Sequence, residues 1–154
     1  MEWITMEKVG TYIHGCKLRK KEDLLKGTYH YAISNLRIPD QTVKVTLDAP
    51  LVVEGVVEVK NLFSKNGIRT NRVNVAENIE IEEGDLLVAN GLEAGGNISV
   101  DGYICARVIT AGGYITTDMG IRAASVTSRS VNGIGIMADT VNVPNIGKHT
   151  VVAQ

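Results

Sequence analysis

LEAGGNISVDGYI (Leu92–Ile104) is followed by ITAGGYITTDMGI (Ile109–Ile121), a near-copy that begins 17 residues later. Each stretch holds two short units in which apolar residues stand two positions apart. Residues at i and i+2 of a strand lie on the same face, so each unit predicts a strand of two or three residues with its apolar side inward. A repeat of about six residues per side is typical of a β-solenoid with three sides to each coil.

Apolar pairs at i and i+2 continue on both sides of these two stretches. They run from Val43 and Val45 to Val141 and Val143 and recur about every six residues, with slips to five or seven. β-branched residues and glycines are frequent, and a sustained helical period is absent. We therefore predict an all-β, single-stranded parallel β-solenoid (β-helix) of about six coils over residues 43–154, with its handedness left open.

Glycines recur at the same interval. One set is Gly67, Gly84, Gly102 and Gly120, and a second set is the pairs Gly95–Gly96 and Gly112–Gly113. A corner that turns sharply inside a stack of coils leaves little room for a Cβ atom. Both sets are therefore predicted to form structural corners.

Residues 1–42 lack the repeat and carry four of the seven aromatic residues. KLRKKEDLLKG (17–27) has leucines among charged residues and ends in glycine, which predicts a short helix. TYHYAI (28–33) alternates and predicts a strand. A solenoid needs a cap at its end, because an uncovered coil exposes strand edges and an open core. We predict an N-terminal α/β cap over residues 1–42.

The bulk properties exclude several classes of protein. The net charge of −1 and the pI of about 6.3 do not favour binding to nucleic acid. The N-terminus does not resemble a signal peptide, and the apolar runs are too short for a membrane span. Cys16 and Cys105 are 89 residues apart and match neither a metal-binding nor a redox motif. These observations predict a cytoplasmic protein without a cofactor.

Acidic residues gather in the middle of the repeat region, since no basic residue lies between Arg72 and Arg107. Glu83, Asp101 and Asp118 lie next to a glycine corner at intervals of 18 and 17 residues, which predicts an acidic column with side chains about 5 Å apart. Such a column can bind a cation or act as an acid–base pair. The rest of the predicted acidic belt, which can offer a negative surface to a basic partner, is Glu77, Glu80, Glu82, Asp85 and Glu93.

Catalytic partners for these carboxylates are absent from the pattern. No Lys, Arg or His accompanies the column to orient a substrate, and no histidine lies between residues 43 and 148. We therefore predict neither a catalytic constellation nor a metal site.

The stretch from Leu51 to Ile146, with the two units quoted above, resembles bactofilin-type bacterial β-helices over about two-thirds of the chain. The resemblance implies cytoplasmic polymers that form without nucleotide, by end-to-end stacking of β-helices. Members of that family tend to have short flexible tails, whereas the cap predicted here would block one stacking surface.

We expect a non-enzymatic structural or protein-interaction solenoid that self-associates or acts as a scaffold, so its partner is itself or another protein. Two alternatives stay open. One is a phage- or mobile-element-encoded inhibitor that binds a host protein through the acidic belt. The other is a carbohydrate-binding or carbohydrate-processing β-helix that uses Glu83, Asp101 and Asp118.

Overall fold

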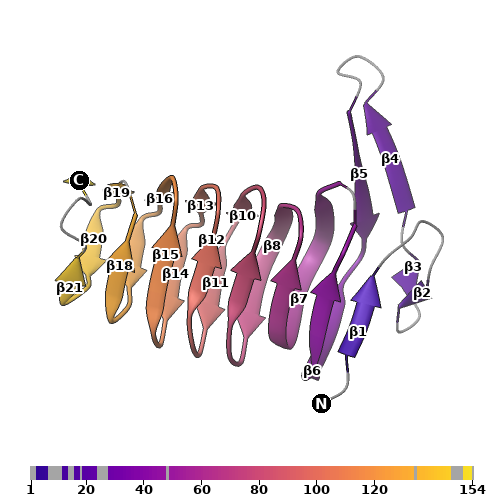
Figure 1. Cartoon of the computed structure of the whole chain (residues 1–154), viewed down its shortest axis with the longest axis horizontal. Coiled ribbons are helices and arrows are strands. Elements are labelled where there is room, and N and C mark those ends of the chain that lie inside the picture. Colours follow the sequence, from indigo (N-terminus) through magenta and orange to yellow (C-terminus); the bar gives the residue numbers. More distant parts are fainter. Residues whose placement is uncertain are drawn as a thin grey trace.

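The computed structural model describes the backbone of residues 3–6, 12–13, 16–17, 19–23, 28–47, 49–133, 135–146 and 151–153, and side chains chiefly from residue 28 onward. Over these residues the chain is all-β, without a helix, and forms a parallel stack of coils. Each coil gives one short strand to each of three sides, and the coils follow one another along the long axis (Figure 1). The predicted parallel β-solenoid is confirmed.

The strands group by side. The first side holds β5 (Thr28–Ile33), the starts of β7 (Leu51–Ser64) and β8 (Ile68–Val75), β10 (Leu86–Val88), β13 (Ile104–Cys105), β16 (Gly120–Arg122), β19 (Gly135–Met137) and β22 (Val151–Ala153). The second side holds the start of β6 (Leu36–Val45), the middle of β7, the end of β8, β11 (Gly91–Ala94), β14 (Val108–Ala111), β17 (Ser125–Thr127) and β20 (Thr140–Asn142). The third side holds β1 (Trp3–Met6), the ends of β6 and β7, β9 (Ile79–Ile81), β12 (Ile98–Val100), β15 (Tyr114–Thr117), β18 (Ser130–Asn132) and β21 (Asn145–Ile146). Outside the coils, β4 (Arg19–Asp23) pairs antiparallel with β5, and β2 (Tyr12–Ile13) with β3 (Cys16–Lys17).

The core consists of three columns of aliphatic side chains, each stacked on its counterpart in the next coil. On the first side these are Leu51, Ile68, Leu86, Ile104, Ile121 and Ile136; on the second, Leu36, Val57, Val73, Leu92, Ile109 and Val126; on the third, Val43, Leu62, Ile79, Ile98, Ile115 and Val131. Each of these side chains is at most 3% exposed. Burial of these columns is the main force that holds the coils together.

The second side holds seven strands in the described part of the chain, one coil more than the sequence predicts. The additional coil is the first, because Leu36 already pairs in parallel with Val57. The stack therefore begins before residue 42, where the sequence predicts the end of the cap. The coils also become shorter, from 19 residues between Ile79 and Ile98 to 15 between Val131 and Ile146.

The predicted helix over residues 17–27 is wrong wherever the structure describes this segment. Lys17 belongs to β3 and residues 19–23 form β4, while residues 18 and 24–27 lie outside the described residues. Pairing with β5 holds the charged segment extended, so tertiary context overrides a local preference for helix. The strand predicted over residues 28–33 is confirmed as β5. The hairpin of β4 and β5 projects beyond the stack (Figure 1).

Parts of the predicted cap lie outside the described residues, namely 1–2, 7–11, 14–15, 18 and 24–27. At this end of the stack, β1 pairs in parallel with the last part of β6 and adds one strand to the third side. Across the described ranges, the structure contains no helix with the length and apolar character needed to cross a membrane.

Candidate interaction surface

The outward residues of the first side form a row that runs from coil to coil. Leu87, Cys105, Arg122 and Met137 each follow a buried core residue and are paired with one another across neighbouring coils. Because successive residues of a strand point to opposite faces, the inward aliphatic column fixes these four side chains on the outer surface. Local alternation thus positions the row, and the coil register brings it together.

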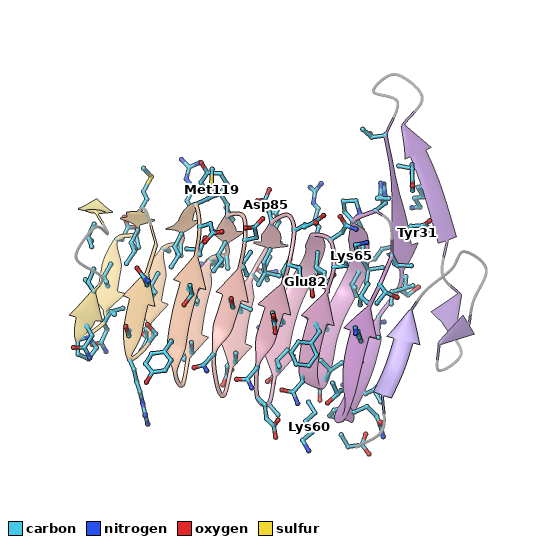
Figure 2. All side chains as sticks on the ribbon, viewed as in Figure 1. Tyr31, Lys60, Lys65, Glu82, Asp85 and Met119 are labelled. Atoms are coloured by element: carbon cyan, nitrogen blue, oxygen red, sulfur yellow. The ribbon has the colours of Figure 1, made fainter. Side chains whose placement is uncertain are left out.

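A groove with a volume of ≈ 710 Å³ lies over this row and is lined mostly by apolar atoms. Its exposed apolar side chains are Tyr103, Met119 and Met137, which are 48%, 39% and 52% exposed. Met119 and Asp85, which both line the groove, lie along the same edge of the stack (Figure 2). Large apolar side chains gathered on a surface are typical of a site that contacts another molecule.

The acidic column lies at the corner between the third and first sides, and the structure brings its members together. Asp101 and Asp118 follow the paired residues Val100 and Thr117, so they are level on neighbouring coils. The hydrogen bond to the Asp118 side chain raises the pKa of Asp101 above its ordinary value. Desolvation and the negative charges of Asp118 and Glu83 raise that pKa further. Negative charge is therefore crowded along this corner.

This crowding predicts a stability that depends on pH. Asp101→Asn is expected to raise the urea midpoint near pH 7 and to leave it unchanged at the acidic end of the range. A carboxyl group with a raised pKa binds more protons in the folded chain than in the unfolded one, so stability falls as pH rises from the unfolded pKa of about 3.9 through the folded value. Asparagine removes that loss. Urea unfolding of both proteins from about pH 3 to 7 measures the difference.

The control for this experiment is Glu93→Gln, which removes an exposed carboxylate from the second side. Its difference from wild type is expected to stay small across the range. A gain from Asp101→Asn that is equal at every pH would contradict the titration argument.

The other acidic residues of the predicted belt lie on different parts of the stack. Glu93 faces outward on the second side. Glu77 lies at the corner between the second and third sides, where its carboxylate forms an ion pair with Lys60 at 3.8 Å. A smaller groove of ≈ 200 Å³ on the third side is lined by Glu80 and Glu82 together with Lys44 and Lys65. The belt is therefore spread over several faces, and lysines lie beside part of it.

Cys105 lies half-buried in the groove and is a free thiol. Desolvation raises the pKa of this thiol, the negative charge of Asp85 raises it further, and Arg122 lowers it. The thiol is therefore protonated near neutral pH and acts as a small, weakly polar part of the groove surface. The side chain of Cys16 lies outside the described residues.

The glycines predicted as corners lie where neighbouring coils approach closely. A Cβ atom on Gly102 would lie 2.5 Å from the carbonyl oxygen of Gly84, and one on Gly84 would lie 2.8 Å from the nitrogen of Gly67. Gly84 also has a φ of 100°, which L-residues rarely adopt. Gly120 meets the carbonyl oxygen of Gly135 instead, at 3.1 Å from its would-be Cβ.

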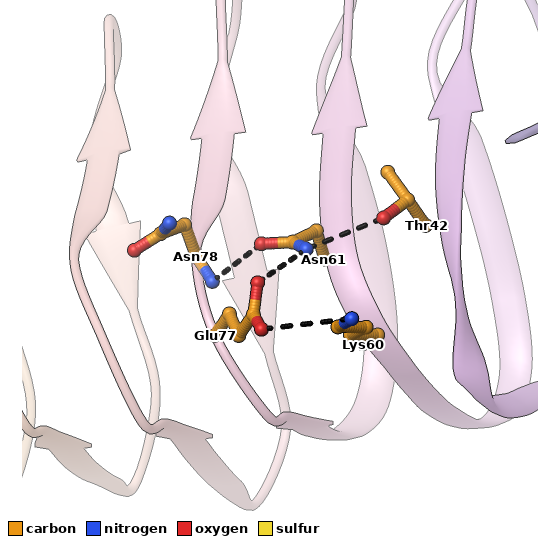
Figure 3. Close-up of polar contacts among 5 residues, drawn as sticks. All are labelled: Thr42, Lys60, Asn61, Glu77 and Asn78. Carbon is orange, nitrogen blue, oxygen red and sulfur yellow. Dashed lines mark hydrogen bonds and ion pairs between the residues drawn. The ribbon is translucent and has the colours of Figure 1, made fainter. Parts of the chain in front are cut away.

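An asparagine at the corner between the second and third sides links three coils, and the sequence did not predict it. Asn61 is 4% exposed. Its Nδ2 donates to Thr42 Oγ1 at 3.2 Å and to Glu77 Oε2 at 2.8 Å, and its Oδ1 accepts from the backbone N–H of Asn78 at 3.0 Å (Figure 3). The side chain thus satisfies a corner N–H that the strand ladder leaves without a partner.

The same bond repeats in the following coils and forms an asparagine ladder of Asn61, Asn78 and Asn97. The Oδ1 of Asn78 accepts from the N–H of Asn97, and the Oδ1 of Asn97 from the N–H of Tyr114, both at 2.8 Å. The sequence signal for this ladder is the recurrence of asparagine after 17 and then 19 residues.

Among the described residues, no group of three or more His, Cys, Asp or Glu is arranged to hold a metal ion. The chain matches no protein-family model, no curated protein and no solved structure with which it was compared. The chemistry of the groove and its acidic border is therefore the basis for assigning a function.

Proposed function

We propose that the chain is a non-enzymatic β-solenoid that self-associates and serves as a rigid scaffold, with the groove of the first side as its contact surface. The observation that supports this proposal is the exposed apolar set of Tyr103, Met119 and Met137 on one side of the stack. Soluble monomers rarely expose a contiguous apolar patch of large size without an interaction role.

The groove suits a protein surface better than a small polar ligand. Among the described residues that line it, Asp85 and Arg122 are the charged ones, and the rest of its wall is largely Leu87, the thiol of Cys105 and methionine side chains. Sites for small molecules place several convergent polar groups to fix the orientation of the ligand. Methionine side chains adapt their shape to a protein partner.

A second copy of the chain is the partner that the charges favour. Asp85 and Arg122 place both signs of charge on one surface, beside the acidic column. A twofold interface uses the same patch on both partners, so it requires a surface that complements itself. An apolar groove bordered by both signs of charge meets this requirement.

The resemblance to bactofilin-type β-helices agrees with self-association and is part of this proposal, together with a cytoplasmic location in a bacterial or phage setting. The inhibitor and carbohydrate alternatives stay predictions. The spread of the acidic belt over several faces makes a single negative docking face less suited to the first of them.

The double variant Met119→Glu, Met137→Glu is expected to abolish self-association and to leave the fold intact. Both side chains are exposed, so the fold tolerates a carboxylate there, whereas burial of two unpaired charges in an interface costs several kcal/mol. Sedimentation velocity over a range of protein concentrations measures the association, and circular dichroism checks the fold.

Val108→Glu is the matched control, because Val108 is 43% exposed but lies on the second side. Its association is expected to equal that of wild type. A wild-type chain that stays monomeric at the highest concentration, or a double variant that associates like wild type, would refute the proposal.

A further inference from the structure

The charges around the groove are placed so that they select one arrangement of two copies. The acidic column lies at the corner that borders the first side, whereas Arg122 points outward from the side itself. Resting on the proposed self-association, we propose that two copies lie side by side with their coils level, related by a twofold axis parallel to the solenoid. In this arrangement Arg122 of each copy meets Asp118 of the other.

One coil supplies both members of this ion pair. Asp118 stands at the corner, Met119 and Gly120 follow, and Arg122 lies two residues beyond Gly120. A twofold axis parallel to the solenoid reverses the strand direction and keeps each coil level with its copy. An axis above Gly120, midway between Asp118 and Arg122, therefore brings the guanidinium of each copy to the carboxylate of the other.

The acidic corner is suited to receive a guanidinium. Asp101 lies beside Asp118 on the neighbouring coil, about 4.8 Å away by strand spacing, and the two carboxyl groups share a hydrogen bond. A planar guanidinium can donate to both at once, which an ammonium does less well. An incoming arginine would also relieve the crowding of negative charge that raises the pKa of Asp101.

Apolar side chains lie at the centre of this arrangement. Tyr103 stands opposite Gly120 on the neighbouring coil, with its Cε1 3.8 Å from where a Cβ on Gly120 would lie. Tyr103 is therefore next to the axis and faces its own copy, with Met119 beside it. An apolar centre with charged pairs at its border is the usual anatomy of a protein interface.

The opposite arrangement, with the two solenoids antiparallel, is disfavoured by charge. A twofold axis parallel to the strands would place the corner of one copy over the same corner of the other. The acidic column would then face itself, and like charges brought together across an interface cost several kcal/mol. Arg122 would have no carboxylate of this column within reach.

A charge-swap experiment on the full chain tests the pairing. Arg122→Glu alone and the double variant Asp101→Lys, Asp118→Lys alone are each expected to weaken self-association about tenfold or more, because each places like charges together in both halves of a twofold dimer. An equimolar mixture of the two proteins restores opposite charges in both halves. Sedimentation velocity of the mixture is therefore expected to show heterodimers of wild-type stability, which high salt weakens.

Arg72→Glu mixed with Glu93→Lys is the matched control, since these exposed residues form part of a depression on the second side. Each of these variants is expected to associate like wild type, alone and mixed. A mixture of the groove variants that stays as weak as its components would overturn the arrangement. Loss of association in the methionine double variant, combined with wild-type association of both charge variants, would uphold the scaffold and reject this pairing. A monomeric wild type would reject both.

Discussion

Gly112→Ala is expected to destabilise the fold by about 3 kcal/mol, because the corner has no room for a methyl group. A Cβ atom at this position would collide with the carbonyl oxygen of Gly95 and lie 2.9 Å from its carbonyl carbon. Both obstacles are backbone atoms of the preceding coil, so they cannot rotate away. Moving them would strain the bond from the N–H of Gly112 to the carbonyl of Ala94, at 2.9 Å. Urea unfolding followed by circular dichroism measures the loss.

Gly91→Ala is the control for this substitution. No atom lies within 4 Å of the Cβ that it would add, so its effect is expected to stay within about 0.5 kcal/mol. Equal losses in the two variants would mean that glycine acts through the flexibility of the unfolded chain, and not through close approach of the coils.

Asn61→Asp is expected to destabilise the fold by about 4 kcal/mol near neutral pH, as an uncompensated buried charge does. The substitution keeps the shape of the side chain and the acceptor for the N–H of Asn78. It replaces the amide donor, which lies 2.8 Å from Glu77 Oε2, with a second carboxylate oxygen. Two carboxylates at this distance repel each other strongly, so the loss is expected to diminish as pH falls and one of them takes up a proton. Urea unfolding at several pH values measures it.

A second substitution tests the cause. Glu77→Gln in the Asn61→Asp background is expected to recover most of the lost stability, because an amide can donate to the introduced carboxylate. Alone, Glu77→Gln removes an exposed ion pair with Lys60, worth at most about 1 kcal/mol. Asn97→Asp is a control on the exposed part of the ladder and is expected to cost little. Failure of the double variant to recover would contradict charge repulsion as the cause.

The inward columns could be predicted because alternation is a local property of the sequence. Ile98 and Val100, or Ile109 and Ala111, identify their strand and its buried face without knowledge of the neighbouring coils. The acidic column could be predicted for a related reason, since its intervals of 18 and 17 residues match the period of the repeat.

The groove and the asparagine ladder could not be predicted, since both depend on the register between coils. Cys105, Arg122 and Met137 are neighbours only because the coils that separate them have 17 and then 15 residues. A constant period would have aligned different residues. The helix prediction failed for a similar reason, because the partner strand β5 fixes the conformation of residues 19–23 and the segment's own composition does not.

The unequal coil lengths have a consequence for how the chain reaches one structure. A stack of identical coils could slip by a whole turn at little cost, because each coil would find an equivalent neighbour. Here the spacing falls from 19 residues between Ile79 and Ile98 to 15 between Val131 and Ile146, so a slipped turn would leave residues bulging at a corner or stretch a corner too short to close. The irregularity that obscures the repeat therefore opposes misalignment and favours a single native register.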